Sequence, residues 1–200
     1  MKNIYLICFF LIFTSISYAK YDPLLVSQLI DKSTIIGVGE IKSIENRNVL
    51  VLLSDVIKGK LTNRTLKIEK FENWTCASRW TNYKKGQKIM FFLTMSKEGI
   101  YNILGSGNEG ELPIAKEKIY YKSLDGGLDE TSTKFVVYGS DLYGYSFNFL
   151  DVKNGILEYI SNRLTYHKIA KQKNNEKQKI KNPFLKKLVS ELYTQIYQYQ

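Results

Sequence analysis

Few residues in this 200-residue chain are of the types that catalyse hydrolysis or bind metals. His167 is the single histidine, and it lies 91 positions after Cys76 (167 − 76). Zinc sites usually need three or four closely spaced ligands, and nucleophilic catalysis needs a base beside the nucleophile. A histidine near the predicted end of a helix more often complements the helix dipole. The sequence therefore predicts no catalytic site, no metal site and no cofactor.

Two pairs of acidic residues offer a second kind of chemistry, namely Glu109 with Glu111 and Asp129 with Glu130. Paired carboxylates can flank a sugar during its hydrolysis, or bind calcium together with loop carbonyls. Acidic residues in loops are more often simply solvated, and we interpret both pairs in this way. The chain is accordingly predicted to be a binding protein and not an enzyme.

A predicted loop at residues 72–85 gathers three large aromatic side chains around Cys76, namely Trp74, Trp80 and Tyr83. If these rings are exposed, they could grip a protein partner or stack on a sugar. If the loop instead folds across the end of a barrel, the tryptophans fill its core. Both interpretations stay open from the sequence, and the first makes Trp74, Trp80 and Tyr83 the candidate partner-binding residues.

The positive charge of the chain is concentrated near its C-terminus. Residues 20–166 carry 20 basic and 17 acidic side chains, whereas residues 167–187 carry eight lysines against Glu176 alone. A polybasic stretch is attracted to an anionic membrane surface. Alternatively, the apolar face of the helix that follows docks on the barrel and the lysines form a solvated linker. The candidate membrane-surface residues are Lys171, Lys173, Lys177, Lys179 and Lys181.

Residues 1–19 have the pattern of a secretory signal peptide. A positive start at Lys2 precedes an apolar run over 4–16, and Ser17 and Ala19 place small residues at the −3 and −1 positions. This run is too short for a membrane span. We expect cleavage near Ala19 and a secreted or periplasmic protein. Its one remaining cysteine, Cys76, cannot form an intrachain disulfide, so it is either a buried thiol or pairs with another molecule.

Hydrophobic periodicity predicts a mainly β chain with flanking helices, an α+β fold. A helix that starts at Asp22-Pro23 precedes the strands, and a helix capped by Asp151 and another opened by Pro183 follow them. The predicted strands are 34–41, 49–57, 64–71, 89–93 and 100–104, with a hairpin at 135–149 that turns at 139–141. Residues 105–132 are predicted to be rich in loops, with a short strand or extended edge at Ile119-Tyr120-Tyr121. We expect one barrel domain over 20–166 and a lysine-rich segment with an amphipathic helix over 167–200.

The block from Ile36 to Leu93 carries a recognisable order of short motifs. Val38-Gly39-Glu40-Ile41 is followed by a strand that ends Asp55-Val56-Ile57-Lys58-Gly59, then by Cys76, and then by Tyr83-Lys84-Lys85-Gly86 before the apolar strand. This order resembles the bacterial secreted versions of the netrin/tissue-inhibitor-of-metalloproteinase-like (TIMP-like) domains. The resemblance covers roughly a third of the chain and implies a five-stranded OB-type barrel, which closes and so removes exposed sheet edges.

The resemblance does not imply protease inhibition. Inhibitors of that family chelate the protease zinc with an N-terminal cysteine that disulfides hold in place, whereas the expected mature chain begins Lys20-Tyr21-Asp22. The scaffold alone is implied, and a fold does not by itself transmit a function. Nucleic-acid binding, a common use of OB-folds, is not expected either, because we predict export and the excess positive charge lies outside the predicted barrel. The expected partner is an unknown protein or envelope component.

Overall fold

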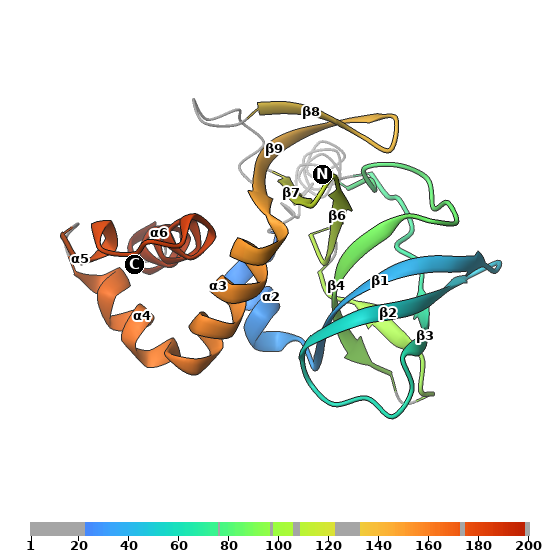
Figure 1. Cartoon of the computed structure of the whole chain (residues 1–200), viewed down its shortest axis with the longest axis horizontal. Coiled ribbons are helices and arrows are strands. Elements are labelled where there is room, and N and C mark those ends of the chain that lie inside the picture. Colours follow the sequence, from blue (N-terminus) through green and yellow to red (C-terminus); the bar gives the residue numbers. More distant parts are fainter. Residues whose placement is uncertain are drawn as a thin grey trace, which may run out of the picture.

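A computed structural model describes residues 23–75, 77–96, 98–105, 109–122, 133–172 and 175–198 (Figure 1). The predicted signal peptide, Cys76, Lys173 and the pair Asp129/Glu130 lie outside the described residues. The described helices are α2 (Val26–Lys32), α3 (Phe149–Ser161), α4 (Arg163–Lys171), α5 (Asn175–Gln178) and α6 (Pro183–Gln198). The described strands are β1 (Ile35–Ile44), β2 (Asn48–Lys58), β3 (Thr65–Glu69), β4 (Lys88–Met95), β5 (Tyr101–Ile103), β6 (Glu111–Ala115), β7 (Lys118–Lys122), β8 (Thr133–Val137) and β9 (Ser140–Asn148).

Five strands close into a barrel in the order β1-β2-β3-β5-β4, and β4 pairs back with β1. All these pairings are antiparallel except that of β3 with β5, which is parallel at Ile68 and Tyr101. The predicted α+β class and the five-stranded OB-type barrel are therefore confirmed. The five barrel strands correspond to the five strands that the sequence predicts, with ends that differ by a few residues.

Two glycines in β1 allow the barrel to bend tightly. A Cβ atom on Gly39 would lie 2.5 Å from a methyl group of Val51 and 2.9 Å from the carbonyl oxygen of Leu52. The register of β1 against β2 shifts between Val38 and Gly39, as expected where a bulge bends a strand. β1 can therefore pair with β2 on one side and with β4 on the other.

Four more strands extend the sheet beyond the barrel in the order β6-β7-β9-β8. β8 and β9 form the predicted hairpin, and its turn consists of Tyr138 and Gly139, both with positive φ. This geometry fits the two-residue turn that right-twisted strands favour. β6 and β7 lie in the region predicted to be rich in loops, so the sequence prediction is wrong over Glu111–Ala115 and incomplete over Lys118–Lys122.

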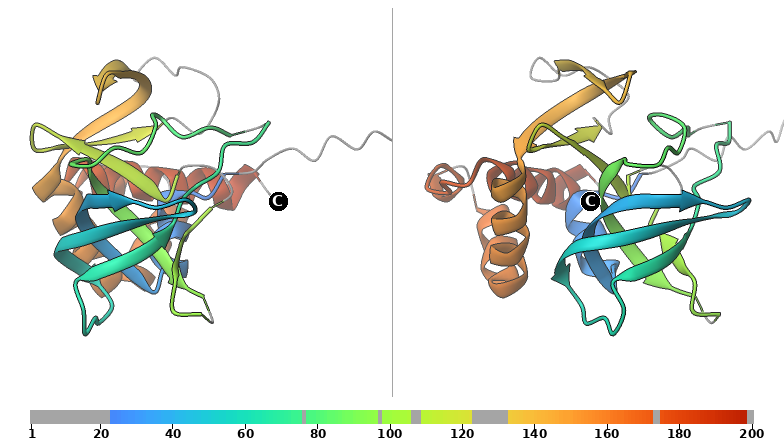
Figure 2. Two further views of the ribbon diagram at one scale, coloured as in Figure 1. Left: turned by 90° about the vertical axis from the view of Figure 1, so that its right-hand side faces the viewer. Right: turned by 45° about the vertical axis from the view of Figure 1, so that its right-hand side comes forward.

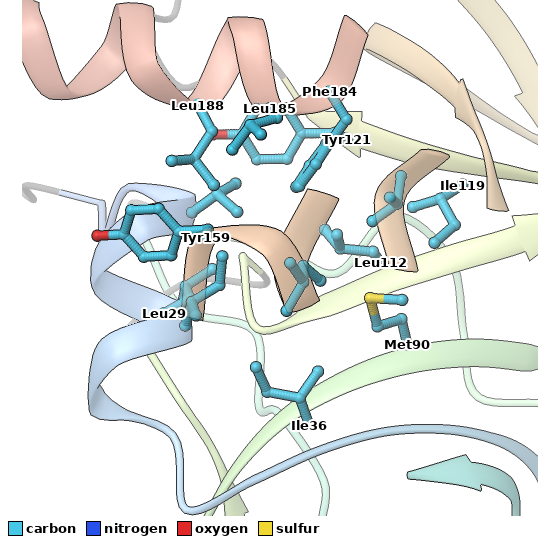
Figure 3. Close-up of a cluster of buried hydrophobic side chains, with 14 of the residues drawn as sticks. Leu29, Ile36, Met90, Leu112, Ile119, Tyr121, Tyr159, Phe184, Leu185 and Leu188 are labelled. Carbon is cyan, nitrogen blue, oxygen red and sulfur yellow. The ribbon is translucent and has the colours of Figure 1, made fainter. Parts of the chain in front are cut away.

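The helices pack together on one side of the barrel (Figures 1 and 2). One hydrophobic core joins them to the sheet, with Leu29 from α2, Tyr159 from α3 and Leu188 from α6 beside Ile36 and Met90 of the barrel (Figure 3). A second core fills the barrel itself and includes Val51, Phe91 and Trp80. The apolar face of α6 is buried. Of the two alternatives for this helix, contact with a membrane or docking on the barrel, the structure shows docking.

Two predicted helix starts are shifted. Asn148, not Asp151, occupies the N-cap of α3, which leaves Asp151 in its first turn. α2 begins at Val26, and the side chain of Gln28 accepts the backbone N–H of Leu25 at 2.9 Å. The expected boundary at residues 166/167 falls inside α4, and α6 shares its core with the barrel. No described helix combines the length and hydrophobicity that crossing a bilayer would require.

Candidate functional site

The connection between β3 and β4 holds the three aromatic residues that the sequence singles out, and it places them differently. Trp80 is 9% exposed and belongs to the barrel core, and Tyr83 is half-buried against the same core. Trp74 is 44% exposed. Of the two interpretations left open by the sequence, the core-filling one fits Trp80, because the loop folds back over the end of the barrel, whereas the exposed one fits Trp74 and only partly Tyr83. Trp74 alone of the three presents a large apolar surface to solvent.

An ion pair inside the protein fixes this loop to β6. Arg79 Nε donates to Glu111 Oε2 at 2.5 Å, and both side chains are almost fully buried. The other guanidinium nitrogens of Arg79 donate to the carbonyl oxygen of Thr81 at 2.6 Å and to Gln87 Oε1 at 3.3 Å. Buried charges are tolerated when they are paired and hydrogen-bonded in this way. Removal of either partner would leave an uncompensated charge in the interior.

Aromatic rings enclose the guanidinium group. Its central carbon lies 4.1 Å from the ring centre of Trp80 and 3.7 Å from that of Tyr83, distances typical of cation–π contacts. Tyr83 donates its hydroxyl to Glu111 Oε1 at 2.8 Å and accepts the backbone N–H of Phe71 at 2.8 Å. The burial of Trp80 and Tyr83 thus has a specific reason, since both rings cover Arg79.

Burial shifts the ionisation of this cluster. Removal from water raises the pKa of the Glu111 carboxyl, while the positive charge of Arg79 and the hydrogen bonds from Tyr83 and Arg79 act in the opposite direction. Burial also raises the pKa of the Tyr83 phenol, and the neighbouring Glu111 charge raises it further. Tyr83 is therefore a neutral donor throughout the physiological pH range.

Trp74 lies in a short, hydrogen-bonded turn ahead of Arg79. Its backbone N–H donates to the carbonyl oxygen of Ala77 at 2.9 Å, and the N–H of Ala77 donates back at 3.1 Å. Asn73 Oδ1 accepts the backbone N–H of Arg79 at 2.8 Å, which ties the turn to the buried ion pair. The arrangement presents an exposed tryptophan on a loop whose base is held by buried polar contacts.

The sequence did not identify Arg79, Glu111 or Gln87 as parts of this site. From the sequence we interpret Glu109 and Glu111 as solvated loop residues, but Glu111 is 1% exposed and Glu109 is buried as well. That interpretation is wrong because Glu111 begins β6 instead of lying in a loop. One signal was available: Glu111 precedes the apolar run Leu112-Pro113-Ile114-Ala115, where a carboxylate is unusual unless it is paired.

The candidate membrane-surface lysines do not form one exposed set. Lys177 is 8% exposed, and its ammonium nitrogen lies 3.5 Å from the ring centre of Tyr193 on α6. Lys171, Lys179 and Lys181 are exposed. The prediction is therefore wrong for Lys177, because α5 packs against α6 and carries this side chain into the contact.

The single histidine has a structural position between two helices. Its Nε2 lies 3.1 Å from the Tyr159 hydroxyl, and the two rings pack with their centres 6.3 Å apart. Among the described residues, no three His, Cys, Asp or Glu side chains gather as metal ligands would.

An open groove of about 960 Å³ runs between the barrel and the first turn of α3. Val38 and Ile114 contribute apolar side chains to its walls, and Lys88, Asp55 and Asp151 contribute charged ones. No nucleophile–base pair lies among the described residues that line this groove.

Comparisons with known proteins add little to this description. No protein-family profile and no curated protein matches the chain. One solved structure, described as an "exosome complex RNA-binding protein", is similar over 84% of this chain and 97% of its own, with 14% sequence identity and a TM-score of 0.28. A likeness at this TM-score supports neither a family nor a function.

Proposed function

We propose that the chain is a non-enzymatic binding protein, secreted or periplasmic, that uses a TIMP-like OB-type barrel as a scaffold. It binds a protein partner through the 72–85 loop, with Trp74 as the anchoring side chain. The observation that carries the proposal is an exposed tryptophan on a loop held by the buried Arg79–Glu111 pair. Tryptophan is enriched among the residues that dominate binding energy, and a loop held rigid beforehand loses less entropy on binding.

Trp74→Ala tests the proposal, and Tyr143→Ala is its matched control. Tyr143 is also an aromatic residue that is 44% exposed, but it lies on β9. Partners captured from the native envelope fraction would be identified by mass spectrometry, and the affinity of each variant for the purified partner would then be measured. We expect Trp74→Ala to weaken binding by about thirtyfold, as loss of a central anchor does, and Tyr143→Ala to leave it unchanged.

Trp80→Ala is not a suitable test, because it would open a cavity in the barrel core and destabilise the protein by about 3–5 kcal/mol. Equal affinities for wild type and Trp74→Ala would exclude this loop as the binding surface.

N-terminal sequencing of the protein recovered from the envelope tests the proposed export separately, with an expected start at Lys20. The alternative of attachment through the basic C-terminal segment loses support, because the apolar face of α6 is buried in the core.

A further inference from the structure

The joint between α3 and α4 leaves three apolar side chains on the surface, namely Leu157, Ile160 and Leu164. Leu157 and Ile160 are three residues apart on one face of α3, and Leu164 lies in the first turn of α4, directly after the bend at Asn162. Leu164 is 79% exposed, more than any other large hydrophobic residue described in the structure. These side chains point away from the core, which α3 contacts through Val152 and Ile156. A group of this kind marks an interaction surface more often than isolated exposed residues do.

Basic side chains surround this joint. Arg163 Nη2 lies 2.6 Å from Asp31 Oδ2 at the end of α2, and Lys58 at the end of β2 donates to the carbonyl oxygen of Ile30 at 2.6 Å. The end of α2, the α3–α4 joint and the β2–β3 connection thus lie at the same end of the molecule (Figures 1 and 2). We call this surface the basic corner; it comprises Lys32, Lys58, Lys60, Arg64, Arg163 and Lys168, together with Leu157, Ile160 and Leu164.

The acidic groups near the basic corner already have cationic or hydrogen-bonding partners. Asp31 pairs with Arg163, and Asp55 pairs with Lys153 at 2.5 Å. Glu158 accepts a hydrogen bond from the Tyr166 hydroxyl. Glu158 keeps its negative charge when it accepts this hydrogen bond, so the six cations of the corner are opposed by two carboxylates, those of Asp31 and Glu158. The surface therefore carries a positive excess beside its apolar side chains.

We propose that the basic corner binds the surface of an anionic lipid membrane. Leu157, Ile160 and Leu164 would enter the boundary between headgroups and acyl chains, while the lysines and arginines bind lipid phosphates, as on interfacial amphipathic helices. Two observations favour a membrane as the binding partner. The described corner offers no exposed aromatic ring on which a nucleic-acid base could stack. Two copies that met through this surface would bring like charges together.

Co-sedimentation with vesicles tests the proposal on the full chain as its cells produce it, so that every variant shares one N-terminus. Vesicles contain equal parts of phosphatidylglycerol and phosphatidylcholine, or phosphatidylcholine alone. We expect wild-type protein to bind the anionic vesicles preferentially and to dissociate as salt is raised. Leu164→Ser should weaken this binding about tenfold, because an apolar side chain leaves the interface. Lys60→Gln/Lys168→Gln should weaken it about twenty-five-fold, at about fivefold per lysine.

Two controls match these variants at other places on the surface. Val136→Ser changes an exposed apolar residue of β8, and Lys42→Gln/Lys67→Gln removes two exposed charges from β1 and β3. Both should bind as wild type does. Equal binding to neutral vesicles, or losses in the controls as large as in the corner variants, would overturn the proposal. So would binding of RNA in place of lipid, or a dimer in solution that Leu164→Ser dissociates.

Discussion

Tyr83 combines a buried phenol with a nearby buried carboxylate, and this makes the stability of the protein sensitive to alkaline pH. Burial raises the pKa of Tyr83 in the folded protein, whereas the unfolded chain ionises near pH 10. The contribution of Tyr83 to the free energy of unfolding is therefore complete below about pH 10 and is lost as pH rises above that value. Each such group reduces the free energy of unfolding by up to about 1.4 kcal/mol per pH unit.

Tyr83→Phe should remove the part of the alkaline pH dependence of stability that the Tyr83 phenol causes. At pH 7 we expect it to be less stable than wild type by about 1–3 kcal/mol, because the partly buried Phe71 N–H and the buried Glu111 carboxylate lose a partner. Between pH 9.5 and about 11, its stability should fall less steeply than that of wild type. Urea unfolding across this range measures both effects, with Tyr143→Phe on the surface as control. Parallel pH profiles for wild type and Tyr83→Phe would contradict the assignment.

The sequence located the loop around Trp74 but not the residues that hold it. Arg79 and Glu111 are 32 positions apart, and nothing in their local patterns indicates a pair. Charged residues are ordinarily predicted at the surface, because burial is favourable only when a partner is present. Which partner is present depends on how β6 lies beside β4 and the loop. That information belongs to the tertiary structure, so Trp80 and Tyr83 could not be assigned to core or surface from their types.

The barrel strands were easier to predict from the sequence than the strands that extend the sheet beyond the barrel. The barrel strands carry β-branched and apolar residues in clear runs, and these runs agree with the observed elements to within a few residues. β6 was missed because Gly110 and Pro113 resemble loop residues. Pro113 is accommodated because β6 pairs with β7 only at Ile114 and Ala115. A proline in a strand is permitted where its missing N–H is not required by the ladder.

The packing of α3 against α6 depends on Gly155. A Cβ atom at this position would lie 2.8 Å from the ring of Phe184, closer than packed carbon atoms tolerate. Helix propensity alone favours alanine over glycine by about 1 kcal/mol. Because α6 would have to shift in a filled core, we expect Gly155→Ala to destabilise the protein by about 1–2 kcal/mol.

Urea unfolding checks this result against Asn154→Ala, an exposed neighbour on the same helix. The control should be stabilised by a few tenths of a kcal/mol, since only propensity acts there. Phe184→Leu should recover part of the loss in the Gly155→Ala background, because the two positions are in contact and their effects are not additive. A gain in stability for Gly155→Ala on its own would show that α6 adapts without cost.

The whole molecule depends on α6 for its hydrophobic core. The buried face of this helix comprises Phe184, Leu185, Leu188, Val189 and Leu192. These side chains share a core with α2, α3 and the barrel strands β1 and β4. The helical layer therefore completes the hydrophobic core over one side of the sheet, and the lysines between α4 and α6 lie along a connection within one folded unit.

A chain that ends after Tyr166 should consequently fail to fold cooperatively. Burial of a large apolar side chain contributes about 1.5–3 kcal/mol, so five of them together are comparable to the total stability of a typical domain, about 5–15 kcal/mol. We expect the truncated chain to lose its near-ultraviolet circular dichroism and its sharp urea transition. Lys186→Ala, an exposed change on α6, should preserve both. If the truncated chain unfolded cooperatively at the wild-type midpoint, the barrel would be independent of the helical layer, and residues 167–200 would form a separate appendage.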